Sequence, residues 1–319
     1  MTDSKLVESR LTRFKRTQFI RDFKMYKKHT ALCLMFLPTV VFFVVFRYVP
    51  MAGIMMAFQD FRLGLGMWNS PFTGLDNFRM LFSMATFQRA LTNTIWISLL
   101  RLFWGFPAPI LLAILLNEIR HTKFKRTVQT ISYLPFFLSW VVLGGIFITI
   151  LSPTTGMVND LLGRFGIDPI FFLGNNDYFR STLVATGIWR GAGWGSILFL
   201  AAIAGIDSSL YETAMCDGAS RWQRIRYITL PCLMPTITIM LILNIGSLLD
   251  GGFDQIFNLY NPAVYASGDI LDTYVFRIGL GQMRFGLATA AGLFTNGVGF
   301  VLVVFANYVA KKIGDYGIW

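Results

Sequence analysis

An all-α integral membrane protein with six transmembrane helices and both termini in the cytoplasm is the fold class that the sequence predicts. Hydrophobic residues make up 55% of the 319 residues and charged residues only 14%, which is more apolar surface than a soluble domain of this length needs. Six separate apolar runs are each long enough to cross a hydrocarbon core about 30 Å thick. Backbone in lipid must satisfy its own hydrogen bonds, so these runs are expected to be helices.

The six runs follow one another along the whole chain after a polar start. They cover residues 31–48, 95–116, 131–151, 181–205, 233–249 and 286–310. No repeat of fixed period and no low-complexity tract divides them. We therefore expect domain boundaries only near the ends, with a basic cytoplasmic arm over 1–30, a transmembrane domain over 31–312 and a cytoplasmic tail over 313–319.

The orientation follows from the lysines and arginines between the runs. Nine lie in residues 1–30, four lie within 120–126, and Arg221, Arg224 and Arg226 follow the fourth run. The alternate segments are longer but poorer, since 49–90 holds three and 152–180 holds two. Cytoplasmic loops carry the excess of basic residues, so both ends are predicted in the cytoplasm.

The same distribution explains the net charge of +11 without nucleic acid as a partner. The basic charge is concentrated in the predicted cytoplasmic flanks, where membrane lipid is the expected partner. The arm over 1–30 is expected to be an anchor of this kind, and an amphipathic helix lying on the anionic inner leaflet is the alternative.

Several kinds of functional site are missing from the sequence. Cys33, Cys216 and Cys232 have no metal-ligand spacing, and we expect no metal site. No glycine-rich loop is followed by the Lys-Ser or Lys-Thr that a phosphate-binding loop requires. The two histidines, His29 and His121, lie in basic flanks without a nucleophile beside them. The chain is therefore not expected to be an enzyme.

A polar insert, DSSLYETAMCDGASRWQRIRYITLPC, occupies residues 207–232 between the fourth and fifth runs. Ser209 and Glu212 have the spacing of a capping box, which predicts a short helix with Ser209 as its N-cap. Gly218 suits the left-handed position that ends such a helix. We expect this helix to lie at the cytoplasmic surface.

A second short helix is predicted directly after the first. Ser220 and Gln223 form a second capping box, and Pro231 is expected to close the helix before the fifth run begins. Helices this short are marginal in water, so the insert needs a surface to pack on. That surface is either the ends of its own spans or another protein.

The spacing within the insert resembles the Glu-Ala-Ala coupling loop of ABC-importer permeases. The family pattern has Glu-Ala-Ala, three residues, Gly, nine residues, Ile, one residue and Leu-Pro, and every spacing agrees here with Thr213 as the one departure. The resemblance implies that the following residues couple the chain to an ATPase: Glu212, Thr213, Ala214, Asp217, Gly218, Ala219, Arg221, Ile228, Leu230 and Pro231.

This resemblance implies the type I ABC importer permease fold in a bacterial inner membrane. It further implies a second permease in a heterodimer, a dimer of ATPase subunits that binds ATP and Mg, and a periplasmic or extracellular solute-binding protein. No cofactor is expected on this chain. Residues 36–61, GLDNF at 74–78 and KKIGDYGIW at 311–319 resemble the sugar-importer branch, including the polysaccharide, lipo-oligosaccharide, maltose and alginate types. That branch implies an oligosaccharide substrate moved inward by alternating access.

Arginines inside the runs indicate where a substrate pathway is expected. Arg101 and Arg190 each cost about 2.5 to 3.5 kcal/mol at a helix centre. We assign Arg101 to structure, whereas Arg190 suits either sugar binding or an ion pair with a partner subunit. Asn244, Ser247 and Gly251 are expected to share a helical face. The predicted pathway residues are Trp189, Arg190, Gly191, Trp194, Asn244, Ser247, Asp250, Gly251 and Phe253.

Alternative functions stay open from the residues alone. A permease for a non-sugar solute shares the coupling loop, and a secondary transporter needs no ATPase but usually has paired sites in two repeated halves, which we do not find. A non-catalytic membrane scaffold would not need the loop spacing. The aromatic-rich segments 48–82 and 251–280 suit either anchoring at the membrane interface or docking of a binding protein.

Overall fold

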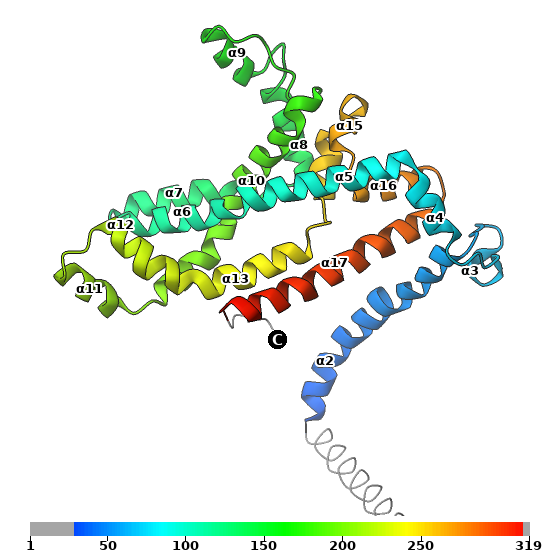
Figure 1. Cartoon of the computed structure of the whole chain (residues 1–319), viewed down its shortest axis with the longest axis horizontal. Coiled ribbons are helices and arrows are strands. Elements are labelled where there is room, and N and C mark those ends of the chain that lie inside the picture. The colour runs from blue at the N-terminus through cyan, green and yellow to red at the C-terminus, as the bar shows by residue number, and fades with distance from the viewer. Residues whose placement is uncertain (1–28, 315–319) are drawn as a thin grey trace, which may run out of the picture. The chain divides into compact units, whose positions relative to one another are not determined.

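The structure is a computed structural model that describes residues 29–314 (Figure 1). Helices follow one another throughout this range, with one isolated β-bridge between Gln59 and Phe72 and no strand among the described residues. The chain divides into two compact units, 1–55 and 56–319. The predicted basic arm and cytoplasmic tail lie almost entirely outside the described residues.

The first unit contributes one apolar helix. It comprises α2 (Thr30–Phe43) and a π turn (Val44–Tyr48), and a 3₁₀ segment (Val49–Phe58) continues from it into the second unit. All described side chains of α2 are exposed in the isolated chain. A helix of this length whose side chains are almost all apolar suits a lipid environment.

The second unit contains the remaining helices. They are α3 (Gly66–Asn69), α4 (Asp76–Ser83), α5 (Ala85–Leu100), a π turn (Arg101–Gly105), α6 (Pro107–Glu118), α7 (Thr122–Tyr133), a 3₁₀ turn (Leu134–Phe137), α8 (Trp140–Ile150), α9 (Met157–Arg164), α10 (Asn176–Ala204), α11 (Ser208–Cys216), α12 (Arg221–Arg224), a π turn (Ile225–Thr229), α13 (Leu230–Gly246), α14 (Phe253–Leu259), a 3₁₀ turn (Pro262–Val264), α15 (Tyr265–Gly268), α16 (Leu271–Phe276), a π turn (Arg277–Gly281) and α17 (Phe285–Gly314).

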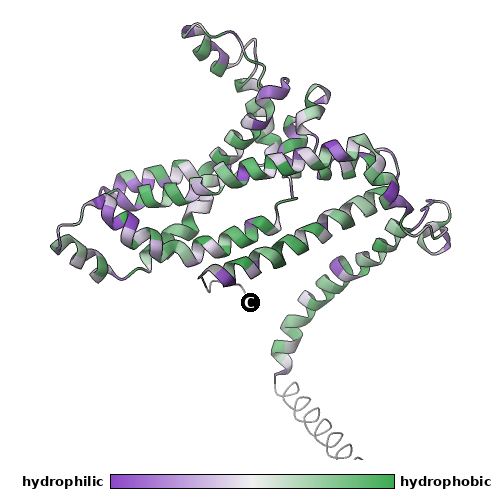
Figure 2. Cartoon of the chain, viewed as in Figure 1, coloured by the Kyte–Doolittle hydropathy of each residue, from purple (hydrophilic) through white to green (hydrophobic). Residues whose placement is uncertain are grey.

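Five helices in the described range are long and apolar enough to cross a membrane. They are Thr30–Phe58, Ala85–Glu118, Asn176–Ala204, Arg221–Gly246 and Phe285–Lys312. Figure 2 shows hydrophobic residues along their lengths, whereas hydrophilic residues gather near α11 and α12 and the adjoining end of α7. The chain is thus a multi-pass helical membrane protein, as the apolar runs predict.

The third apolar run does not form the single straight helix that the sequence predicts over 131–151. α7 with its 3₁₀ turn and α8 meet at a bend of 105°, and counting this bent pair as one span brings the candidates to six. Pro135 lacks an amide hydrogen and sits in the first turn of the 3₁₀ segment. Ser139 then starts α8 afresh, because its hydroxyl accepts a hydrogen bond from the Val142 amide at 3.4 Å. Proline and a new N-cap together explain the break.

α10 is the central helix of the second unit, since it packs on α6, α7 and α13. Two buried apolar clusters lie on either end of it. One joins α5, α10 and α14 through Ile97, Leu183 and Ile256, and the other joins α6, α10 and α13 through Ile114, Phe199 and Leu233. These contacts fix the positions of the helices that surround the cavity described below.

Close approach of α10 to α7 depends on Gly193. A Cβ atom at this position would lie 2.0 Å from the backbone oxygen of Ser132. We therefore expect Gly193→Ala to push the two helices apart and destabilise the protein by about 1 to 3 kcal/mol, the usual cost of overpacking. The matched control is Gly191→Ala on the same helix, where an added Cβ meets nothing within 4 Å. Thermal unfolding of the two purified variants in detergent should show a lowered Tm for Gly193→Ala alone, and equal Tm values would contradict the proposed packing.

Candidate functional site

The first helix of the polar insert, α11, begins at Ser208 with Asp207 as its N-cap. The Asp207 carboxylate accepts a hydrogen bond from the Ser209 amide at 2.9 Å, and this bond lowers the pKa of Asp207. The predicted capping box with Ser209 as N-cap is therefore wrong by two positions. A carboxylate at a helix N-terminus also gains from the helix dipole, which explains why Asp207 takes this place.

The end of α11 has the predicted left-handed glycine. Gly218 has a φ of 77°, and its amide donates to the Met215 oxygen at 3.1 Å. The Ala219 amide reaches back to the Ala214 oxygen at 2.8 Å, which completes a Schellman motif. The motif reverses the chain tightly after Cys216, and only glycine adopts this φ without strain.

The second helix of the insert starts as predicted but does not stop at Pro231. Ser220 and Gln223 form the capping box, with bonds of 2.7 and 3.3 Å. The helix then continues through a π turn and α13, so that Arg221–Gly246 forms a single 26-residue helix. Because proline is tolerated where its missing amide is not needed, the wider turn before Pro231 lets the helix pass through. The predicted closure at Pro231 is wrong.

One side-chain contact joins α11 to this long helix. The Tyr211 hydroxyl lies 2.9 Å from the Thr229 hydroxyl, and Thr229 is only 2% exposed. The two parts of the insert are thus linked by the chain at Gly218 and by this hydrogen bond.

Most of the other side chains in the insert are exposed to solvent in the isolated chain. α11 and α12 contain no buried residue, and the exposed side chains include Leu210, Met215 and Trp222, the last of them 68% exposed. Of the residues predicted to couple, Glu212, Thr213, Asp217, Gly218, Arg221, Leu230 and Pro231 are exposed, and Ala214, Ala219 and Ile228 are half-buried. A short helix with apolar and charged groups turned outward suits docking in a cleft of another protein.

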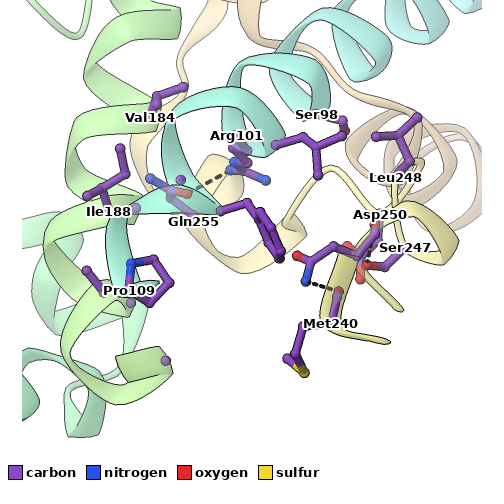
Figure 3. A pocket seen from close by; sticks show the side chains of 18 of the residues that line it. Ser98, Arg101, Pro109, Val184, Ile188, Met240, Ser247, Leu248, Asp250 and Gln255 are labelled. Atoms are coloured by element: carbon purple, nitrogen blue, oxygen red, sulfur yellow. Dashed lines mark hydrogen bonds between the residues drawn. The ribbon is translucent and has the colours of Figure 1, made fainter. Parts of the chain in front are cut away.

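A cavity of about 420 Å³ lies between the helices of the second unit (Figure 3). Its walls come from the middle of Ala85–Glu118, from α10, and from the end of α13 with the segment that follows it. Four predicted pathway residues line it, namely Gly191, Asn244, Ser247 and Asp250. The rings of Trp140 and Phe106 and the side chains of Ser98, Arg101 and Gln255 add to the lining.

Arg190 supports the bend in the third run and does not line this cavity. Its guanidinium donates to the backbone oxygens of Phe136 at 3.1 Å and Leu138 at 3.2 Å. It also lies over the rings of Phe136 and Trp140, 5.2 and 5.0 Å from their centroids. Arg190 thus satisfies carbonyl groups that the broken helix leaves free, which a membrane interior requires.

The other predicted pathway residues are distributed around the site. Trp189 packs edge to face on Phe147, and Trp194 stacks on Phe136 with centroids 4.6 Å apart. Gly251 does not share a helical face with Asn244, because α13 ends at Gly246. After Gly246 the helix gives way to turns. Within them, the Gly251 amide donates a hydrogen bond to the Asp272 carboxylate at 3.2 Å.

Arg101 has a larger role than the sequence predicts. Its guanidinium donates to the Gly251 oxygen and, at 2.7 Å, to the Gln255 side chain (Figure 3). Gln255 in turn donates to the Thr186 hydroxyl at 2.9 Å on α10. Arg101 therefore fixes the unwound segment after α13 and lines the cavity at the same time. These partners lie about half the chain away, so no local pattern could reveal them.

A second cavity, of about 650 Å³, lies on the other side of the segment after α13. It is bounded by α13, α16 and α17, and Ser247 and Asp250 line both cavities. Phe253, Thr295 and Asn296 also line it, together with Asp272. Burial, with the nearby Asp250 carboxylate as a second cause, raises the pKa of Asp272.

Comparison with protein families finds one matching family. Residues 105–315 match the model of the "Binding-protein-dependent transport system inner membrane component". Among curated proteins of Bacillus subtilis, the polygalacturonan/rhamnogalacturonan transport system permease protein YteP is 44% identical and covers 90% of both chains. Protein LplB of the same organism is 41% identical and covers 92% of both.

Two solved structures of a bacterial ABC transporter contain chains similar to this one. A bacterial ABC transporter involved in the import of the acidic polysaccharide alginate contains a chain with a TM-score of 0.86 and 43% identity. The match covers 92% of the present chain and 99% of the other. A chain from the alginate transporter in complex with an alginate pentasaccharide-bound periplasmic protein matches equally well.

Proposed function

Because the chain belongs to the family of inner membrane components of binding-protein-dependent transport systems, we propose that it is the permease subunit of an ATP-driven importer of oligosaccharides. Members of this family are transport components, so the chain is not an enzyme. The main support for the proposal is the position of α11. This helix is exposed, and a hydrogen bond to Thr229 joins it to a continuous helix that ends at the cavity. This arrangement connects a docking surface to a substrate-sized space.

In this proposal, ATP hydrolysis drives transport by moving α11. ATP and Mg bind to a separate dimer of ATPase subunits, and closure of that dimer moves α11. The movement passes through Gly218 and the Tyr211–Thr229 hydrogen bond to Arg221–Gly246. Asn244 and Ser247 at the far end of this helix line the cavity, so access to the cavity alternates between the two sides of the membrane.

An oligosaccharide suits the cavity because its lining combines ring faces with polar groups. Trp140 and Phe106 offer apolar faces for sugar rings, and Asn244, Ser247 and Asp250 offer groups that bind hydroxyls. Relatives named for polygalacturonan/rhamnogalacturonan and alginate transport support the same class of substrate. A second permease subunit completes the pathway as the partner in a heterodimer, and a solute-binding protein delivers the cargo from outside.

The proposed topology places both termini and α11 on the cytoplasmic side of a bacterial inner membrane. Cys216 in α11 is exposed, so a variant that keeps only this cysteine reports its location. A membrane-impermeant maleimide should label Cys216 in inside-out vesicles and leave it unlabelled in right-side-out vesicles. A cysteine placed at Phe165, which is 83% exposed after α9, should give the opposite pattern. Labelling of both positions from the same side would refute this topology.

The substrate class is tested by ATPase stimulation of the reconstituted complex. Binding protein loaded with members of a glycan panel should raise ATP hydrolysis over the empty binding protein. If amino acids or ions stimulate hydrolysis while every glycan fails, the chain serves a non-sugar importer. Uptake that proceeds without the ATPase subunits would indicate a secondary transporter.

A further inference from the structure

We propose that Arg101 selects oligosaccharides that carry carboxylate groups, by binding a uronate within the 420 Å³ cavity. This inference rests on the proposed function and narrows its substrate class. Arg101 lines the cavity close to its boundary with the segment after α13, and Figure 3 shows it beside Ser98 and Gln255.

The positive charge of Arg101 interacts with the Asp250 carboxylate but is not neutralised by a salt bridge among the described residues. Arg101 takes part in none of the four salt bridges found among the described residues. Its two hydrogen-bond acceptors, the Gly251 carbonyl and the Gln255 amide oxygen, are both uncharged. A guanidinium has five donors, and the bonds to Gly251 and Gln255 use two of them. Planar guanidinium groups bind carboxylates strongly, often through two parallel hydrogen bonds.

Ser98 supplies a second polar group at the same position. It precedes Arg101 by one helical turn, so the two side chains lie on one face of the span. Ser98 is 6% exposed and lines the cavity, and its hydroxyl has no hydrogen-bond partner among the described residues. A buried hydroxyl without a partner is costly, and rotation of the Ser98 side chain towards the cavity would let a ligand oxygen satisfy it.

The two cavities differ in the charged residues that line them. Asp250 is the only other charged residue in the lining, and one of its carboxylate oxygens accepts the Gly252 amide at 3.1 Å. The second cavity holds Asp250 and Asp272 and no basic residue among its lining side chains. A carboxylate-bearing ligand is therefore favoured beside Arg101 and disfavoured on the other side of the Ser247–Gly252 segment.

Direct binding to the purified complex of permeases and ATPase in nanodiscs tests this inference without the selectivity of the binding protein. The probes are trigalacturonate and its fully methyl-esterified, uncharged form. Wild-type complex is expected to bind the acidic probe more tightly. Arg101→Gln should lower this preference about tenfold, the value of one charge-assisted hydrogen bond. Arg101→Lys, which keeps the charge, should retain most of it.

A second variant keeps the test informative if Arg101→Gln disturbs folding. Asp250→Asn removes the competing negative charge, and its amide oxygen can still accept the Gly252 amide. The preference for the acidic probe should then rise severalfold, opposite to the effect at Arg101. Arg164→Gln serves as the matched control, since Arg164 is an exposed residue paired with Asp160 in α9.

The outcomes separate this inference from the proposed function. Equal wild-type affinity for the two probes, or parallel loss of both in Arg101→Gln with no change of preference in Asp250→Asn, would overturn the role of Arg101 alone. Failure of the wild-type complex to bind either probe, at concentrations where another solute binds, would overturn the oligosaccharide assignment as well.

Discussion

Replacement of Gly218 by aspartate is expected to uncouple transport from ATP hydrolysis while the protein stays inserted in the membrane. Gly218 has a φ of 77°, where an L-residue with a side chain costs about 1 to 2 kcal/mol, and it forms the Schellman turn that directs the chain from α11 to α12. A change in the direction of α11 misplaces the docking surface. Transport should fall at least about tenfold, in line with usual coupling free energies.

The matched control for this experiment is Gly166→Asp. Gly166 has a φ of 76° and ends α9 with the same pair of backbone bonds, from Gly166 to Gly163 and from Ile167 to Leu162. Added side chains meet nothing within 4 Å at either glycine. Both variants therefore carry similar strain, but only Gly218→Asp should separate ATP hydrolysis from transport or weaken ATPase association. Equal transport by the two variants would count against a coupling role for the insert.

Replacement of Asp269 by alanine is expected to be the most destabilising single change in the second unit. Asp269 is 4% exposed and accepts two hydrogen bonds from Arg277, at 2.9 and 2.6 Å, and one from Thr273 at 2.9 Å. These hydrogen bonds raise the pKa of Arg277, whose guanidinium lies over the rings of Tyr265 and Tyr274. Because Arg277 is 28% exposed, the expected cost lies between that of breaking an exposed pair, about 0 to 1 kcal/mol, and that of breaking a fully buried pair, about 3 to 5 kcal/mol.

Thermal unfolding of the purified protein measures this effect. Asp160→Ala is the control, since Asp160 forms an ion pair with Arg164 in which both side chains are well exposed. Exposed pairs contribute about 0 to 1 kcal/mol, so the control should leave the Tm almost unchanged. A small change in Asp269→Ala would show that the Asp269–Arg277 pair does not hold α15 and α16 in place.

Features that depend on local chemistry could be predicted from the sequence. Apolar runs of bilayer length located the membrane helices, and the spacing around Gly218 located the turn of the polar insert. The N-cap at Asp207 was missed, because Asp207 and Ser209 both suit an N-cap and only the course of the chain from α10 decides between them. Pro231 was misinterpreted for a related reason, since a π turn in front of a proline leaves no trace in residue spacing.

Features that depend on distant contacts could not be predicted. Arg190 acts on carbonyl groups more than fifty residues earlier in the chain, so its pattern of neighbouring tryptophans and glycines was misleading. The space beside Gly193 is filled by the backbone of α7 at Ser132, a contact that residue spacing does not reveal. Arg101 meets Gly251 and Gln255 only because α5 and α14 pack together around Ile97 and Ile256.

ATP-dependent uptake of a labelled oligosaccharide into proteoliposomes shows whether the chain is the permease of an ATP-driven oligosaccharide importer. The vesicles contain this chain, its partner permease and the ATPase dimer, with loaded binding protein outside and ATP inside. We predict accumulation that requires both ATP and binding protein and that is lost in the Gly218→Asp complex. Uptake that continues without ATP, or no uptake of any oligosaccharide while another solute accumulates, would contradict the account.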